Sequence, residues 1–409
     1  MLSNKSIVSK PILISLLTVL LVIAILYKPT HHDLIIMKDI HWISLLAKNL
    51  FIFLIALVSS LTFCYVIIKT NHMHGHFSND HVDSGPQKTH RQATPRIGGL
   101  AIFAGLFAAF YAEMLLIPET PSLDDDLLLF AAVPAFVGGL IEDLTKNVGT
   151  TQRLLLSMIS AAIMICIFGT VISRTEIPFL DYALAWLPFA ALFTVFAVAG
   201  VSNAINIIDG YNGLASGFSI IALVALAIVA SLVNDQLVFM ISVSIAGATL
   251  GFLVWNWPKG KIFLGDSGAY LLGFMLAELS VLLVYRNPTV SPWFPLLLLA
   301  YPIYETLSSI FRRKFSSKLA YDQPDALHLH HLISNQLVAN NIRKNDIVGE
   351  FVLTTIQNSR VAPYIWIGSI LSSIFAIMFF KNTAILMLAT LAGCIFYSYI
   401  YKQLKKHQR

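Results

Sequence analysis

The sequence predicts an all-α polytopic integral membrane protein, a bundle of about 11–12 transmembrane helices. Of its 409 residues 57% are apolar and only 12% are charged, and the mean hydropathy is +0.75. A bilayer core roughly 30 Å thick needs about 20 apolar residues per helix, and windows of that kind recur from end to end. This composition excludes an ordinary soluble chain.

Twelve such windows follow one another along the chain. They cover 11–27, 46–68, 97–117, 127–141, 154–173, 183–202, 214–233, 237–255, 268–285, 293–311, 363–380 and 383–401. The fourth is short and carries Gly and Pro. Between the tenth and the eleventh lies 312–362, which is the only sizeable soluble part that we expect.

The first window follows Lys5 and Lys10, as a secretory signal would. No small-residue cleavage site comes before "YKPTHHD", so an uncleaved anchor is the better interpretation. We therefore divide the chain into an additional N-terminal transmembrane anchor, 1–45, and a membrane-embedded domain, 46–409. The three cysteines all fall inside apolar windows, where a thiol behaves as a small apolar residue.

The basic residues predict the orientation. With the N-terminus inside, the inner loops hold 21 of the 27 Lys and Arg, which is the imbalance expected of a protein in a cytoplasmic membrane. The net charge of +5 does not indicate a nucleic-acid partner, because the basic residues are dispersed over loop ends. Membrane lipids are the expected surroundings.

Five polar stretches fall on this inner face. They are "QKTHRQATPRIGG" (87–99), "GGLIEDLTKNVGTTQR" (138–153), "NAINIIDGYNGLASG" (203–217), "NWPKGKIFLGDSG" (256–268) and "HLHH" (328–331). A protein that only spans a membrane has no reason to gather acids, asparagines and histidines on one side. Their convergence predicts a functional site.

The acids of these stretches are suited to binding a divalent ion. Grouped carboxylates repel one another unless a cation or protons neutralise them, and Mg²⁺ binds one or two carboxylates together with phosphate oxygens. We expect Asp209 and Asp266, each beside Gly at a helix entry, to act in this way, because helix N-termini attract phosphate. Any one of the acids taken alone is better explained as capping or solvating a helix end.

Basic residues and histidines have competing explanations. Lys88 and Arg96 either anchor phosphates or only mark topology, whereas the positions of Lys146 and Arg153 at loop ends are explained by topology. The three histidines of 328–331 lack a second ligand pair at the spacing of zinc sites, so phosphate or sugar recognition suits them better. Glu278 lies inside an apolar window, where it is either a functional acid or half of an interhelical hydrogen bond.

Taken together, the five stretches resemble the polyprenyl-phosphate N-acetylhexosamine-1-phosphate transferases from about residue 50 to residue 400. The family patterns RKxHxxPTPRxGG, DDxxxxS, NxxNxxDGxDGLA and NxxPAxxFxGDxG correspond in order to the first four stretches. "YPIYETLSSIFRR" (301–313) is similar to the family helix that ends in PxxDTLxxxxRR, before the histidine loop.

The resemblance implies cytosolic active-site loops and a set of site residues. It implies a catalytic group of Glu142, Asp143, Asp209, Asp266 and Lys146. It implies Mg²⁺, with Mn²⁺ as the alternative, at Asp266, Asp209 and Asn206. It implies substrate contacts from Lys88, His90, Arg96, Asn206, Asn212, Asn256, Phe263, Glu305, Arg312, Arg313, His328, His330 and His331. The implied substrates are undecaprenyl phosphate and a UDP-N-acetylhexosamine.

Two departures from the family pattern and several alternatives stay open. Glu142 replaces the first of the paired aspartates, so either Glu142 or Asp143 deprotonates the acceptor, and Asn212 replaces the second Asp of DGxDG. A phospho-MurNAc-pentapeptide transferase is the near alternative. A transporter of nucleotide sugars or lipid-linked sugars would place acids at the midplane and on both faces. A membrane scaffold needs none of the motifs. A homodimer is also left open.

Overall fold

The structure is a computed structural model that describes residues 35–80, 93–116, 123–315, 327–342 and 350–406. It begins with the long helix α2 (Ile35–Lys69) and the short α3 (Asn71–Ser78). The two-residue strands β1 (Asn79–Asp80) and β2 (Thr94–Pro95) pair antiparallel. The proposed anchor window 11–27 lies outside the described residues.

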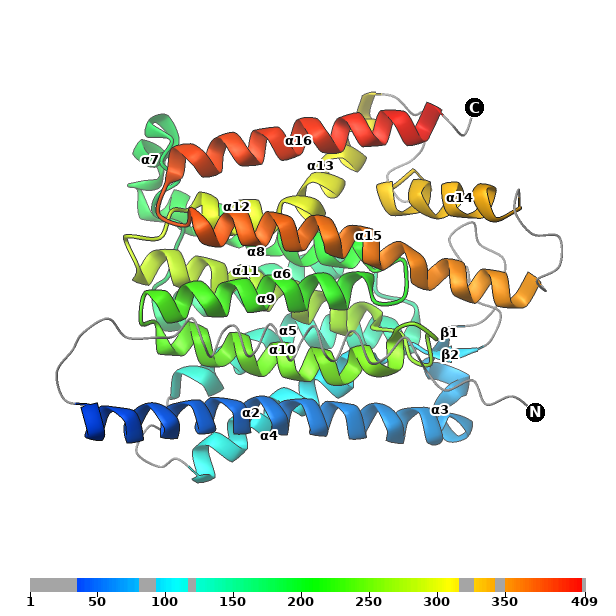
Figure 1. The fold of residues 1–409 in the computed structure, drawn as a ribbon, viewed down its shortest axis with the longest axis horizontal. Coiled ribbons are helices and arrows are strands. Elements are labelled where there is room, and N and C mark those ends of the chain that lie inside the picture. The colour runs from blue at the N-terminus through cyan, green and yellow to red at the C-terminus, as the bar shows by residue number, and fades with distance from the viewer. Residues whose placement is uncertain (1–34, 81–92, 117–122, 316–326, 343–349, 407–409) are drawn as a thin grey trace.

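Helices make up the rest of the described chain (Figure 1). They are α4 (Gly98–Leu116), α5 (Leu123–Thr145), α6 (Thr150–Phe168), α7 (Pro178–Leu184), α8 (Leu187–Ile208), α9 (Leu214–Leu232), α10 (Gln236–Asn256), α11 (Gly265–Arg286), α12 (Trp293–Leu298), α13 (Ala300–Phe315), α14 (Leu329–Ile342), α15 (Glu350–Met378) and α16 (Thr383–Lys406). Within the described residues, ten helices are long and apolar enough to cross a membrane. The predicted class, an all-α multi-pass membrane protein, is confirmed.

The predicted tenth window, 293–311, is wrong as a single helix. The structure divides it into α12 and α13, with a break at Leu299. Pro302 explains the break, because a proline lacks the amide hydrogen and its ring collides with the carbonyl of the residue four positions earlier, here Leu298. The predicted loop 312–362 also contains α14 and the first part of α15. Hydropathy detects neither feature.

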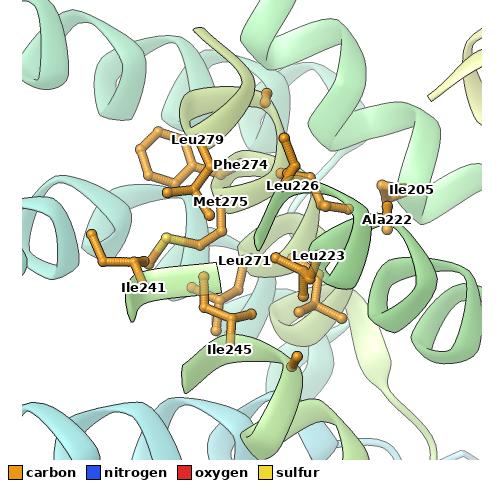
Figure 2. Packing of buried hydrophobic residues seen from close by; sticks show 14 of the residues in the cluster. Ile205, Ala222, Leu223, Leu226, Ile241, Ile245, Leu271, Phe274, Met275 and Leu279 are labelled. Carbon is orange, nitrogen blue, oxygen red and sulfur yellow. The ribbon is translucent and has the colours of Figure 1, made fainter. Parts of the chain in front are cut away.

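Helix α11 forms the centre of the bundle. Every residue in the most apolar window of its membrane span is buried inside the protein. Figure 2 shows Leu271, Phe274 and Met275 of α11 packed against Leu223 and Leu226 of α9 and against Ile241 and Ile245 of α10. A helix that is apolar on all sides must be surrounded by other helices, so α11 is held in one position and orientation.

The two ends of the bundle differ in what they carry. The strands β1 and β2 and helix α14 lie at one end, which we call the site end, and α7 lies at the opposite end (Figure 1). The described parts of all five motif stretches reach the site end, because each adjoins a helix terminus there. Helix α5 runs to Thr145 and α8 to Ile208, beyond the predicted 141 and 202, so Glu142 and Asp143 lie on the last turn of α5 and Asn206 on the last turn of α8.

Candidate functional site

The N-terminus of α11 is held by a carboxylate from another helix. Asp143, on the last turn of α5, is fully buried. Its Oδ1 accepts a hydrogen bond from the amide of Asp266 at 2.8 Å, and its Oδ2 accepts from the amide of Ser267 at 2.9 Å and from the hydroxyl at 2.7 Å. These are the bonds of a helix N-cap, supplied here across 123 residues of sequence. Asp143 therefore fixes where α11 begins.

Glycine permits this close approach. Gly265 has a φ of +72° and stands where an added Cβ would collide with the carbonyl oxygen of Arg96 and with the carboxylate of Asp143. Only glycine combines this left-handed backbone with so little space. The segment that carries Arg96 also pairs with the chain before α11, because Gly98 donates to the carbonyl of Phe263 at 2.9 Å. Three motifs thus meet at one point.

Asp266 lies at this point and faces cationic groups. Arg96 Nη2 donates to its Oδ1 at 2.7 Å, Asn206 Nδ2 donates to the same oxygen at 2.9 Å, and Arg153 pairs with Oδ2. Arg96 Nε also lies 3.5 Å from Asp143. The Asp266 carboxyl is nearly buried, and the ion pair with Arg153 is the contact that its Oδ2 makes; Nε of Arg153 is buried without a hydrogen bond. Two arginines converging on one carboxylate make a site with affinity for phosphate oxygens.

Asp209 lies beside this cluster. The expectation that it stands at a helix entry is wrong, because it is the C-cap of α8, whose buried residues Ala204, Ile205 and Ile208 extend the helix through the motif. Burial raises the pKa of the Asp209 carboxyl to about 7, with Arg96 opposing the shift and Asp143 adding to it. Its carboxylate makes no hydrogen bond to any residue that the structure describes. Asp209 is therefore available to a ligand.

The histidines lie against the turn that follows Asp209. A Cβ added to Gly210 would lie 3.3 Å from Nε2 of His330, and the ring centroid of Tyr211 is 5.7 Å from that of His330 and 5.6 Å from that of His331. Tyr301 contacts Nδ1 of His330 at 3.1 Å, while Nε2 is buried without a hydrogen bond. Burial lowers the pKa of His330 well below its usual value, and the neighbouring histidines and Arg312 add to this. These surroundings favour the neutral form of the His330 ring.

Other expected site residues brace the loops. Asn256 accepts from the amide of Gly213 at 2.6 Å and donates to the carbonyl of Ile262 at 2.8 Å. The side chain of Asn212 donates from Nδ2 to the carbonyl of Pro258 at 3.2 Å, and its backbone amide donates to Oδ1 of Asn358 at 2.7 Å. Both asparagines are buried, so they hold the 209–213 turn against the chain before α11.

Glu142 and Lys146 hold the turn after α5. Glu142 Oε2 accepts from the amide of Val148 at 2.7 Å, and Lys146 donates from Nζ to the carbonyl of Asp143 at 2.7 Å. The side chain of Glu305 lies behind the histidines, where it contacts His328 at 2.8 Å and Arg312 at 3.6 Å. Arg313 follows on the last turn of α13. Lys88 and His90 lie outside the described residues.

The donor set at Asp266 suits Mg²⁺ only together with a substrate. Within the described ranges, no three His, Cys, Asp or Glu side chains are grouped so that they could hold a metal ion. Mg²⁺, however, is usually bound by one or two carboxylates plus substrate phosphates, and keeps waters. The carboxylate of Asp266, whose Oδ2 has Arg153 as its partner, and the available carboxylate of Asp209 fit that pattern.

Three contributors were not identified from the sequence. Arg153 stood among basic residues that topology explains, Ser267 is one ordinary residue of "GDSG", and Tyr211 is an apolar position within the polar stretch 203–217. Each acts through a partner far away in the chain, namely Asp266, Asp143 and the histidines. No local spacing reveals such pairings.

Known proteins are similar to this chain over the region that contains the site. The family model described as glycosyl transferase family 4 matches residues 127–284, which include Asp143, Asp209 and Asp266. The chain is 34% identical over 248 residues to a probable undecaprenyl-phosphate N-acetylglucosaminyl 1-phosphate transferase of Bacillus subtilis, covering 60% of this chain and 67% of that protein.

Two further relatives extend the comparison. The chain is 30% identical over 251 residues to an undecaprenyl-phosphate alpha-N-acetylglucosaminyl 1-phosphate transferase of Thermotoga maritima, covering 61% of this chain and 72% of that protein. It is 34% identical over 220 residues to a phospho-N-acetylmuramoyl-pentapeptide-transferase of Oceanobacillus iheyensis, covering 49% of this chain and 65% of that protein.

Proposed function

Because the chain belongs to glycosyl transferase family 4, the polyprenyl-phosphate N-acetylhexosamine-1-phosphate transferases, we propose that it transfers a sugar phosphate from a UDP-N-acetylhexosamine to undecaprenyl phosphate. The sugar phosphate is GlcNAc-1-phosphate or a related N-acetylhexosamine 1-phosphate. The product would start an envelope polysaccharide or an O-antigen. The observation that carries the proposal is the convergence of Arg96 and Arg153 on Asp266 at the end of a membrane-spanning bundle.

The reaction forms one P–O bond and breaks another. An oxygen of the polyprenyl phosphate attacks the β-phosphorus of the UDP-sugar, the bond from that phosphorus to the bridging oxygen breaks, and UMP leaves. Such a transfer depends mainly on alignment and on neutralising charge at the oxygens. Arg96 and Arg153 supply fixed positive charge for this purpose, and the neutral His330 offers a buried ring nitrogen.

Of the two candidate proton acceptors, the contacts favour Glu142. Both oxygens of Asp143 accept hydrogen bonds from the start of α11, so Asp143 is better suited to positioning that helix. Glu142 uses Oε2 for the amide of Val148, and its Oε1 has no hydrogen bond to a described residue. A carboxylate with a free oxygen can accept or orient a proton.

Mg²⁺, with Mn²⁺ as the alternative, is part of the proposal. Asp266, Asp209 and Asn206 would hold the ion, which when bound would neutralise charge on the donor diphosphate. Arg153 forms an ion pair with Oδ2 of Asp266. The Arg153 side chain would therefore have to move away from this oxygen when the metal binds. Removing divalent ions with a chelator should abolish turnover, and Mg²⁺ should restore it.

The proposed location is a cytoplasmic membrane, with the site end facing the cytoplasm. Support comes from the distribution of Lys and Arg among the loops. A soluble nucleotide sugar and a lipid phosphate can meet only at that interface. Reporter tags at the two termini should both give cytoplasmic signals. A C-terminal tag reporting from the outside would contradict the orientation.

The decisive assay gives the purified protein Mg²⁺, undecaprenyl phosphate and a panel of UDP-N-acetylhexosamines, and measures UMP. We expect release with at least one donor and none without the lipid phosphate. No UMP from folded protein with any donor would reject the proposal. The transporter and scaffold alternatives lose support because the relatives are named as transferases. The pentapeptide transferase relative covers a smaller share of the chain.

A further inference from the structure

The last helix contributes a buried contact to the site, although it lies at the edge of the bundle. Only 11% of the most apolar window of α16 is buried inside the protein. Tyr397 of this helix nevertheless donates a hydrogen bond from its hydroxyl to Oε2 of Glu305 on α13, at 2.6 Å. Its ring also packs edge to face on Tyr304, with the centroids 5.1 Å apart. Through Tyr397, helix α16 thus reaches the buried carboxylate of Glu305.

Glu305 collects several donors from different elements. Besides Tyr397, Nδ1 of His328 contacts Oε1 at 2.8 Å and the amide of Leu329 donates to Oε2 at 3.1 Å. Arg312 lies 3.6 Å from Oε1. The carboxyl is fully buried and both of its oxygens are used. A substrate could therefore bind Glu305 only by displacing one of these protein contacts, which argues against a direct role in binding.

These contacts place the histidines. Leu329 is the first residue of α14, so Glu305 fixes the start of that helix as Asp143 fixes the start of α11. The ring of His328 stacks on His330 with centroids 5.2 Å apart and planes 13° apart. His330 in turn faces Gly210, next to Asp209. A continuous set of contacts therefore runs from α16 to the turn at Asp209.

We propose that Glu305 and Tyr397 are positioning residues that set His328 and His330 against the Asp209 turn. This inference rests on the proposed function, since the histidines are expected to contact the donor. Glu305 supplies the charge and the two acceptor oxygens, and Tyr397 directs one of those oxygens toward the amide of Leu329. Helix α16 then contributes to catalysis through the hydroxyl group of Tyr397.

The test compares Tyr397→Phe with Tyr399→Phe in the full-length protein. The first substitution would keep the ring packing and lose only the hydroxyl, while Tyr399 lies two residues further on and is 60% exposed. A hydrogen bond to a buried carboxylate corresponds to a change of about tenfold. We expect Tyr397→Phe to raise the KM for the UDP-sugar about tenfold, and Tyr399→Phe to leave it unchanged. The KM for polyprenyl phosphate should change by less than about twofold in both.

A double-mutant cycle shows whether Tyr397 acts through Glu305. Glu305→Gln should raise the donor KM more than Tyr397→Phe does, and the double variant should match Glu305→Gln alone. If the fold-changes in donor KM of the two single variants multiply in the double variant, the proposal is overturned. It is also overturned if Tyr397→Phe has the same donor KM as Tyr399→Phe. A fall in kcat with both KM values unchanged would indicate general loss of folded protein and would also overturn it.

Hydrogen exchange tests the placement without turnover. The amide of Leu329 should exchange faster in Glu305→Gln than in the wild-type protein, and amides in α9 should not change. Unchanged exchange at Leu329 would reject the role of Glu305. Because this measurement needs no activity, an inactive wild-type enzyme would count against the proposed function and leave the positioning proposal to be decided by exchange.

Discussion

Helix α11 is held at both ends by a charged side chain from another part of the chain. At the site end, the Asp143 carboxylate accepts from the first amides of the helix. At the opposite end, Arg174, from the segment before α7, donates from Nη2 to the carbonyls of Val290 at 2.6 Å and Val284 at 3.3 Å. An acid at the N-terminus and a base at the C-terminus both complement the helix dipole. In this respect the two ends are alike.

The ends differ in how completely their charges are paired. At the opposite end, Arg174 also pairs with Glu176 at 2.9 Å, and Asp235 accepts from Arg286 at 3.0 Å. At the site end, Arg96 and Arg153 share Asp266, and Nε of Arg153 is buried without a hydrogen bond. Buried polar atoms without hydrogen bonds are rare in folded proteins and need an explanation. One end of α11 is paired within the protein, and the other carries the groups that we propose to bind ligands.

The largest expected effect is at Asp266. Replacing Asp266 by Asn keeps the shape and removes the charge between Arg96 and Arg153, so we expect the rate of UMP release to fall at least about a hundredfold. Unfolding in detergent should show that the protein still folds. A wild-type rate would remove Asp266 from the site and with it the contrast between the two ends.

The second effect concerns the cap at the site end. Asp143→Asn loses the charge that faces Arg96 and weakens the bonds to the start of α11, which we expect to lower the free energy of unfolding by about 2 kcal/mol. Turnover per folded molecule should fall as well, roughly tenfold, because Asp266 moves with the helix. Thermal unfolding and UMP release measure the two effects. Unchanged stability would contradict the capping role.

The matched change at the opposite end should affect stability alone. Arg174→Met keeps an unbranched apolar stem and leaves the carbonyls of Val284 and Val290, at and just beyond the end of α11, without this donor, so the free energy of unfolding should fall by about 1–2 kcal/mol. Turnover per folded molecule should stay within about twofold of the wild type, since a change far from the site usually leaves chemistry intact. If Arg174→Met lost as much turnover as Asp143→Asn, the two ends would not be functionally distinct.

The smallest effect is expected at Asn212, whose hydrogen bonds hold a loop at the site end. Asn212→Asp keeps the backbone bond to Asn358 and loses one donor to the carbonyl of Pro258, so at least about a tenth of the activity should remain. UMP release under saturating donor is the measurement. A complete loss would mean that residue 212 contacts the substrate directly.

Some site residues can be identified from the few residues around them, and others depend on partners far away in the chain. Asp266 was identified because it stands beside glycine at the start of an apolar window, which is visible within a few residues of sequence. Arg153 and Tyr397 were not, since each owes its role to a partner on a different helix, far away in the chain. Asp209 was expected at a helix entry and caps a helix exit, because apolar residues extend α8 through the motif.

The sequence by itself determined that the chain is a helical membrane protein, where most helices lie and which motifs share one face, since apolar length and charge distribution are local properties that the bilayer imposes. Only the tertiary structure decided that Asp143 caps α11, that Glu305 supports the histidines and that one predicted helix is broken at Leu299. The physical reason is that a buried carboxylate must satisfy its charge with whichever donors the packing brings near, and packing joins residues far apart in the chain.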